Sequence, residues 1–120
     1  MRPHQKLELW RKAIDFVLAI YRITERFPKE EKFGLTSQMR RAAVSVAANI
    51  AEGAARTSAK EFMQFLSHSQ GSASEVDTEQ LIASRLGYLC EKDYLDLSRD
   101  MDDIGRMLTG LSQSLKRRAT

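Results

Sequence analysis

Polar side chains recur at regular intervals through an otherwise apolar run of the chain, RRAAVSVAANIAEGAAR at residues 40–56. Successive residues of a helix are about 100° apart around its axis. These side chains therefore share an arc of roughly 80°, together with Gln38, which precedes the run. We call this arc the polar seam: Gln38, Arg41, Ser45, Asn49, Glu52 and Arg56. A seam of this kind could be a network of hydrogen bonds and ion pairs that holds the fold together, or it could bind a polar ligand.

The surrounding residues favour the structural network. Glu52 and Arg56 are four residues apart with the acid first, which is the favourable order for a helical ion pair. Gly53 costs about 0.5–1 kcal/mol of helix stability relative to alanine, so we expect a close helix approach there. Acidic residues later in the chain are natural partners for the arginines of the run: Glu75, Asp77 and Glu79 for Arg40, Arg41 and Arg56. We therefore predict an enclosed helix with a satisfied seam, and ligand binding is the alternative.

Arrangements of residues that support catalysis or metal binding are not found in the sequence. The six glycines are isolated from one another, so there is no Gly-rich phosphate loop. His4, His68 and Cys90 are far apart, and no Glu-x-x-His pair of a carboxylate-bridged bundle occurs. His68 could act as a general base only in principle, and Cys90 is more simply a loop thiol. These observations predict a protein that is not an enzyme and uses no cofactor or metal.

Composition and charge place further bounds on the class of protein. A chain of 120 residues with 42% apolar content is expected to form one domain over residues 1–120. The single cysteine, the absence of an apolar run of ~20 residues and an N-terminus without a hydrophobic signal core predict a cytoplasmic location. The net charge is only +3, but basic residues gather in the first helical stretch and in the C-terminal KRR tail. The candidate phosphate contacts are Arg11, Lys12, Arg22, Lys116, Arg117 and Arg118.

The elements that must position these residues are four long helices, expected at residues 7–27, 35–56, 59–86 and 91–116. Pro28 ends the first helix, because the residue before a proline avoids the helical region. Ser58 and Glu61 have the spacing of a capping box at the start of the third helix, and Gly87 can supply its left-handed C-terminal cap. Short connections force consecutive helices to be antiparallel. The prediction is an all-α, antiparallel up-and-down four-helix bundle.

The first helix carries more apolar surface than a bundle core requires. Its first stripe is Trp10, Ala13, Ile14, Val17, Tyr21 and Thr24, and the adjoining stripe is Leu9, Phe16, Ile20, Ile23 and Phe27. If the first stripe faces the core, the second would be a large exposed apolar patch. We therefore predict a subunit interface that includes Leu9, Phe16, Ile23 and Phe27. The alternative is a wide stripe that the N-terminal arm covers.

The sequence also resembles a known family. The resemblance rests on residues 7–56, where FGL-x-x-Q-x-R-R-A-x-x-S precedes N-I-A-E-G, then on S-x-K-E-F-x-x-F-L and GSASEVDTEQLIA in the third helix. In these motifs the chain is similar, over about residues 7–115, to the bacterial four-helix-bundle protein family. That family includes proteins encoded in intervening sequences of large-subunit ribosomal RNA genes and the accessory variability determinants of diversity-generating retroelements.

The resemblance implies a four-helix bundle that assembles into a ring-like homopentamer with no known catalytic activity. In the retroelement branch, it implies a basic pentamer that binds nucleic acid and a reverse transcriptase. The motif positions read as structural: Arg40, Arg41, Ser45, Asn49, Glu52, Gly53 and Glu75. The chain departs from the family pattern at Cys90, where serine is more usual, and in its low net charge.

Three functional hypotheses follow from the sequence and the resemblance. The leading hypothesis is an oligomeric scaffold, with itself as partner, that contacts RNA or DNA without sequence specificity or contacts a protein such as a reverse transcriptase. The alternative is a protein-interaction module that binds no nucleic acid, which the low net charge favours. A remote third hypothesis is a small-molecule binder in the bundle core or in the pore of a ring. No membrane partner is expected.

Overall fold

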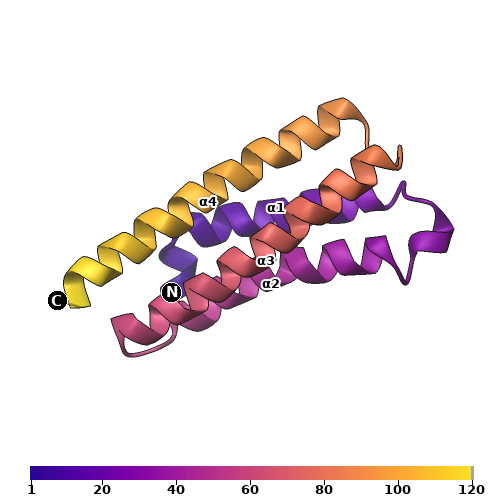
Figure 1. Ribbon diagram of the computed structural model, residues 1–120. Coiled ribbons are helices and arrows are strands. Elements are labelled where there is room, and N and C mark those ends of the chain that lie inside the picture. Colours follow the sequence, from indigo (N-terminus) through magenta and orange to yellow (C-terminus); the bar gives the residue numbers. More distant parts are fainter. Residues whose placement is uncertain (120) are drawn as a thin grey trace.

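The computed structural model describes residues 1–119, which form a bundle of four long helices. Figure 1 shows how the helices lie side by side. The helices are α1 (Glu8–Thr24), α2 (Leu35–Ala54), α3 (Ala59–Arg85) and α4 (Glu91–Ala119). Short 3-10 turns precede α1 and α2: η1 (Pro3–Lys6) and η2 (Lys29–Glu31). Each helix packs against its neighbours in the sequence, and α4 packs on α1 to close the bundle. The predicted all-α, up-and-down four-helix bundle is confirmed.

The helix ends follow from local chemistry. Thr24 ends α1 three residues earlier than predicted, because Arg26 and Phe27 bond to carbonyl oxygens three residues back and tighten the last turn before Pro28. At the start of α3, the Ser58 hydroxyl accepts a hydrogen bond from the Glu61 amide at 3.1 Å, as predicted. The Glu61 carboxylate accepts from the Ser58 hydroxyl rather than from its backbone, so the capping box is only partly formed. Gly87 has φ +82° and follows the end of α3, as its left-handed cap requires.

The core lies along the common axis of the helices and draws on all four of them. Its largest fully buried apolar side chains are Phe16, Ile20, Met39, Ile50, Leu66, Leu97, Ile104 and Leu108. Close packing of α2 on α3 depends on Gly53, where a Cβ atom would lie 2.8 Å from Phe62 Cδ1 and 2.9 Å from Phe65 Cβ. This contact confirms the predicted close approach at Gly53.

The assignment of the two α1 stripes is wrong. Leu9, Phe16 and Phe27 keep at most 7% of their surface exposed and form part of the core of the single chain, while Ile23 packs partly buried against it. These residues are therefore not a free surface for a second subunit. The two stripes adjoin on one helix, so the sequence pattern alone could not show which of them points toward α3 and α4. Of the other stripe, Ala13 and Thr24 are buried as well, Trp10, Ile14 and Val17 are partly buried, and Tyr21 is 41% exposed.

The termini and connections divide between the two ends of the bundle (Figure 1). The N-terminus, the α2–α3 connection and the C-terminal end of α4 lie at one end. The α1–α2 and α3–α4 connections lie at the other end. The bundle measures 48 × 21 × 21 Å, and α4, with 29 residues at about 1.5 Å each, spans most of its length. Residues far apart in the sequence therefore meet at the two ends.

Candidate functional site

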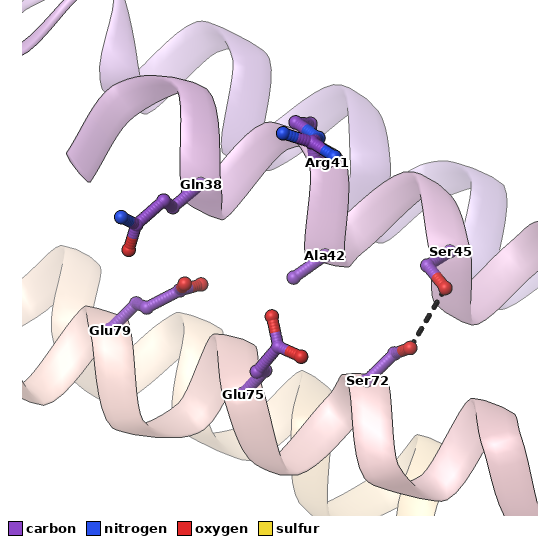
Figure 2. A pocket seen from close by; sticks show the side chains of 7 residues that line it. All are labelled: Gln38, Arg41, Ala42, Ser45, Ser72, Glu75 and Glu79. Atoms are coloured by element: carbon purple, nitrogen blue, oxygen red, sulfur yellow. Dashed lines mark hydrogen bonds between the residues drawn. The ribbon is translucent and has the colours of Figure 1, made fainter. Parts of the chain in front are cut away.

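A polar cleft opens between α2 and α3 (Figure 2). Its volume is about 370 Å³, and side chains from both helices line it: Gln38, Arg41, Ala42 and Ser45 from α2, with Ser72, Glu75 and Glu79 from α3. The Ser45 and Ser72 hydroxyls are hydrogen bonded at 2.8 Å and close one end of the cleft. Small side chains at these positions and at Ala42 leave the space that the longer polar side chains surround. The structure therefore brings part of the polar seam together with Glu75 in one concave site.

Glu79 is the most unusual group in this cleft. Only 7% of the residue is exposed, its Oε1 atom has no hydrogen-bond partner, and its carboxylate points from α3 into the space between the helices (Figure 2). Burial raises the pKa of Glu79 from 4.5 to about 7, and the negative charge of Glu75 contributes to the shift in the same direction. The carboxyl group therefore keeps its proton to a higher pH than an ordinary glutamate does. A titrating acid in a cleft is a recognised mark of a functional site.

The arginines of the seam do not neutralise this carboxylate. Within residues 1–119, Arg41 is exposed and forms no ion pair, although it lines the cleft beside Glu75 and Glu79. Arg40 turns the other way, toward α1, where its Nε donates to Thr24 Oγ1 at 2.9 Å and its guanidinium lies 3.5 Å from Glu25. The predicted pairing of these arginines with Glu75, Asp77 and Glu79 is wrong. Arg40 lies on the α1 side of α2, and Arg41 extends away from α3.

The rest of the seam divides into a bonded centre and an open end. Asn49 Nδ2 donates to the backbone oxygen and the hydroxyl of Ser45 at 2.9 and 3.0 Å, which extends the Ser45–Ser72 bond into a network. The predicted Glu52–Arg56 pair is confirmed at 3.9 Å. However, the side chains of Glu52 and Arg56 are 58% and 44% exposed, so this end of the seam is not enclosed as predicted. Screening by water makes such a pair weak.

The candidate phosphate contacts lie only partly together, because Arg22 is at the other end of α1 from Arg11 and Lys12. Lys116, Arg117 and Arg118 are exposed in the last turn of α4, as predicted. Lys12 forms an ion pair with Asp103 at 3.4 Å, and Arg11 donates to the Gln5 carbonyl at 2.7 Å. Arg22 lies in the last turn of α1, toward the opposite end of the bundle from the tail, so it does not share a surface with Lys116, Arg117 and Arg118.

Other cations, which sequence reasoning did not select, share the end of the bundle where the tail lies. We call the exposed set the basic end: Arg2, Lys6, Arg56, Lys60, Lys116, Arg117 and Arg118. The exposed acids nearby are fewer: Glu8, Glu52 and Glu61. An up-and-down topology places the start of α1, the end of α2, the start of α3 and the end of α4 at one end, so the order of helices could have predicted this cluster.

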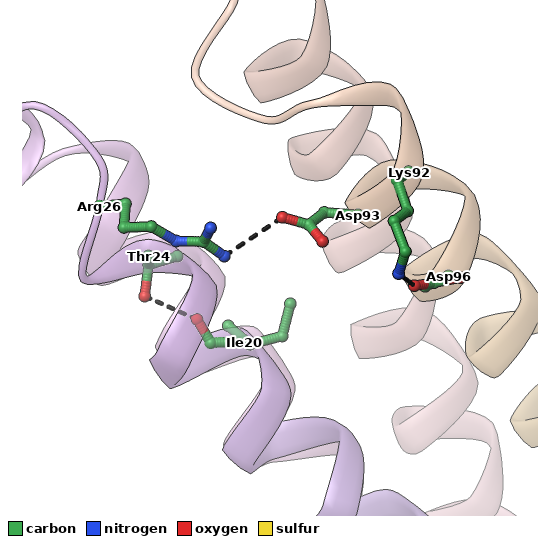
Figure 3. Close-up of polar contacts among 6 residues, drawn as sticks. All are labelled: Ile20, Thr24, Arg26, Lys92, Asp93 and Asp96. Atoms are coloured by element: carbon green, nitrogen blue, oxygen red, sulfur yellow. Dashed lines mark hydrogen bonds and ion pairs between the residues drawn. The ribbon is translucent and has the colours of Figure 1, made fainter.

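The opposite end of the bundle has a different charge pattern. There Arg26 pairs with Asp93 at 3.2 Å, and Lys92 pairs with Asp96 at 2.9 Å (Figure 3). The hydrogen bond between Lys92 and Asp96 raises the pKa of the lysine and lowers that of the aspartate. These pairs neutralise much of the local field. The basic end is therefore the better candidate surface for an anionic partner.

An apolar groove of about 230 Å³ lies on the surface between α1 and α2. We call it the apolar groove, and its lining residues are Trp10, Ile14, Val17, Val44, Ala47 and Ala48. Exposed apolar side chains continue the surface, since Leu18 is 50% and Tyr21 41% exposed. The N-terminal arm covers only one end, where the His4 ring meets Trp10 edge-on at 4.8 Å. The alternative prediction, a wide apolar stripe that the N-terminal arm covers, is therefore correct only for the Trp10 end of the apolar groove.

Ser72 was missed as a site residue and Glu79 was predicted only as an ion-pair partner of the arginines, although a signal for both existed. Ser72, Glu75 and Glu79 have the i, i+3, i+7 spacing that places side chains on one helix face. A polar row on that spacing beside the small residues of the third helix indicates a face turned toward a second polar surface. What the sequence could not show is that the arginines opposite point elsewhere.

The fold and its polar surfaces define a small all-α bundle protein. The sequence matches the family model of the 23S rRNA-intervening sequence proteins over residues 5–110. The chain therefore belongs to the 23S rRNA-intervening sequence protein family.

A solved structure has the same fold. It is the crystal structure of a protein of unknown function from the S23 ribosomal protein family of Bacteroides thetaiotaomicron, with a TM-score of 0.78 and 21% sequence identity. The match covers 87% of this chain and 97% of that one. No protein of curated function was found to match. Among the helices described, none combines the length and apolar character needed to cross a membrane.

Proposed function

We propose that this protein is a non-enzymatic oligomeric scaffold that presents its basic end to nucleic acid. The observation that carries the proposal is the gathering of exposed cations from four separate chain segments at one end of the bundle. Phosphate binding depends on how many cations face one surface, and a compact cluster releases several counterions at once. The Phe65 ring contacts the cluster but lies under the Arg56 guanidinium, whose Cζ atom is 4.6 Å from the ring centroid. Contact with bases by stacking is therefore not expected, and binding should be independent of sequence.

Assembly would multiply this surface. The apolar groove and the exposed Val44, Leu18 and Tyr21 side chains form a continuous apolar area on α1 and α2, of the kind that subunits bury between them. A second copy of the chain is the proposed occupant, because the family resemblance implies a ring of five. In such a ring every exposed cation of the basic end appears five times.

The test is binding of a fluorescently labelled single-stranded RNA and a DNA duplex, followed by anisotropy. At about 50 mM salt we expect measurable binding that falls steeply by about 200 mM. The variant Lys116→Gln, Arg117→Gln, Arg118→Gln should bind more weakly. On single strands, a plot of the logarithm of the binding constant against the logarithm of the salt concentration should have a shallower slope for this variant. The difference should be roughly 0.7 for each phosphate that the variant no longer neutralises. A matched control removes the same charge at the other end of the bundle: Arg22→Gln, Lys29→Gln, Lys32→Gln.

Two results would reject the nucleic-acid role. Equal weakening in both triple variants would mean that net charge alone drives binding, without a dedicated surface. Absence of binding at about 50 mM salt by the intact protein would favour the second candidate function, a protein-interaction module. The observation that favours this second candidate is that Lys12, Arg26 and Arg40 already have acidic partners within the chain.

A further inference from the structure

The two carboxylates of the α2–α3 cleft have an arrangement that folding alone does not favour. Glu75 and Glu79 are four residues apart on α3, where like charges repel along a helix. Both line the same cleft, and Glu79 is withdrawn from water. The stability of the fold would be served better by a glutamine or by an apolar side chain at position 79. The buried Glu79 carboxylate therefore lowers the stability of the fold, and no hydrogen bond to its Oε1 atom within residues 1–119 offsets this loss.

Within residues 1–119, no cationic side chain forms an ion pair with Glu75 or Glu79. The only cationic side chain that lines the cleft is Arg41, which forms no ion pair within residues 1–119 and lies at the outer edge of α2 (Figure 2). Gln38 and the serine hydroxyls contribute neutral polar atoms, and neither α1 nor α4 contributes a lining residue. The buried Glu79 Oε1 atom is left without a donor. A buried acceptor without a partner is costly, so a donor from outside the chain is the natural complement.

We propose that the α2–α3 cleft binds a guanidinium or primary ammonium group. Such a group offers several N–H donors and one positive charge, which match the acceptors on Glu75 and Glu79 and the hydroxyls of Ser45 and Ser72. A divalent metal fits less well, because residues 1–119 contain no cluster of three or more carboxylate, imidazole or thiolate ligands. An anion is disfavoured by two carboxylates against one arginine.

Occupancy should depend on pH because the site contains a titrating acid. The ionisable group that acts on Glu79 is Glu75 on its own helix, and Arg41 lines the same cleft from α2 without pairing with either carboxylate. A cation pairs with the ionised carboxylate, so binding should strengthen as the pH rises through about 7 and should lower the pKa of Glu79. The cation can come from a free small amine or guanidine, or from the side chain of another copy of the chain. Both sources present the same chemistry.

Agmatine is a suitable probe, since it carries a guanidinium at one end and a primary ammonium at the other. Titration into the full-length protein, followed by NMR, should shift the signals of the cleft residues Ser45, Ser72 and Glu79. Glu79→Gln and Glu75→Gln should each weaken the affinity by about tenfold, the loss expected for one charge-assisted hydrogen bond. Asp77→Asn removes the same charge from the opposite face of α3 and should leave the affinity unchanged.

Light scattering in the presence of agmatine distinguishes the two sources. If a side chain of another copy occupies the cleft, agmatine should lower the mass of any assembly. If a free small molecule is the ligand, the mass should stay constant while the NMR shifts appear.

Two results would overturn the proposal. One is the absence of agmatine-dependent shifts in the cleft at about pH 8. The other is a Glu79 pKa in the ligand-free protein that lies at or below its ordinary value and rises in the Arg41→Gln variant. That result would mean that the Arg41 guanidinium already pairs with Glu79 and fills the cleft.

Discussion

Replacing Glu79 by glutamine should stabilise the protein, and the gain should depend on pH. The carboxyl group has a pKa of about 7 in the folded protein against 4.5 ordinarily, so the folded state holds its proton more tightly than the unfolded chain. Below pH 4.5 both states are protonated, and the group costs the fold nothing. As the pH rises from 4.5 to about 7, Glu79 ionises in the unfolded chain before it ionises in the folded protein, which lowers the free energy of the unfolded state. The wild type therefore loses stability relative to the glutamine variant over this range.

The magnitude follows from the size of this shift. At about 1.4 kcal/mol per pKa unit, a rise from 4.5 to about 7 corresponds to at most about 3.5 kcal/mol. The cleft opens to solvent, which screens the charge, so we expect an advantage of about 1–2 kcal/mol for Glu79→Gln near pH 8. For a domain of this size, that advantage raises the Tm by roughly 3–6 °C for each kcal/mol.

Urea denaturation followed by far-UV circular dichroism measures this difference directly. Wild type and Glu79→Gln should have similar free energies of unfolding near pH 4 and should diverge until about pH 7, after which the gap stays constant. Asp77→Asn, an exposed change on the same helix, should show no such divergence. A difference that does not vary with pH would refute the reasoning. So would a variant that is less stable than wild type at about pH 8.

The remaining predictions concern packing and the arginines. Gly53→Ala should lower the Tm, because its Cβ would meet Phe62 Cδ1 at 2.8 Å; Gly105→Ala, with nothing within 4 Å, should raise stability by about 0.5–1 kcal/mol. If both changes stabilise the protein, α2 and α3 do not pack as tightly as described. Glu52→Ala should change the free energy of unfolding by only about 0.5 kcal/mol, since its pair is exposed. Arg40→Ala should lower the free energy of unfolding by clearly more than Glu52→Ala, because it removes polar contacts with Thr24 and Tyr21 of α1 and with Glu25. Equal losses in the two variants, measured by the same chemical denaturation, would contradict this prediction.

The fold was predictable because its local signals agree with one another. Pro28, Ser58 and Gly87 each mark a helix end, and the apolar periodicity of the long segments fits one architecture. The helix boundaries differ from the prediction by at most three residues. At α1 the difference arises because the amides of the last turn before Pro28 donate hydrogen bonds to carbonyl oxygens three residues back instead of four. Whether a last turn tightens in this way depends on how it packs.

The orientation of polar and apolar surfaces was less predictable. Two apolar stripes on α1 compete for the core, and the positions of the neighbouring helices decide that Phe16 is fully enclosed while Trp10 is only partly buried. The arginines show the same limit. Arg40 and Arg41 are adjacent in sequence, yet one binds α1 and the other extends into solvent. A helical wheel places residues around an axis, but it does not determine which neighbouring helix each long side chain reaches.

The basic end shows what topology adds to sequence. Lys6, Lys60 and Arg118 lie in separate segments, and only antiparallel packing brings them to one end. Net charge, at +3, gave a misleading impression of an almost neutral surface. Its distribution over the folded chain is what a nucleic acid would meet.

Assembly through the apolar groove is the claim on which the scaffold proposal depends most, and the mass in solution tests it most directly. Multi-angle light scattering on the purified chain should give about five times 13.7 kDa. Ile14→Glu with Val44→Glu should reduce this mass while the helical circular dichroism is kept, whereas Leu81→Glu on α3 should leave it unchanged. A wild-type mass of 13.7 kDa at micromolar concentration would contradict the account, as would a groove variant that retains the full assembly.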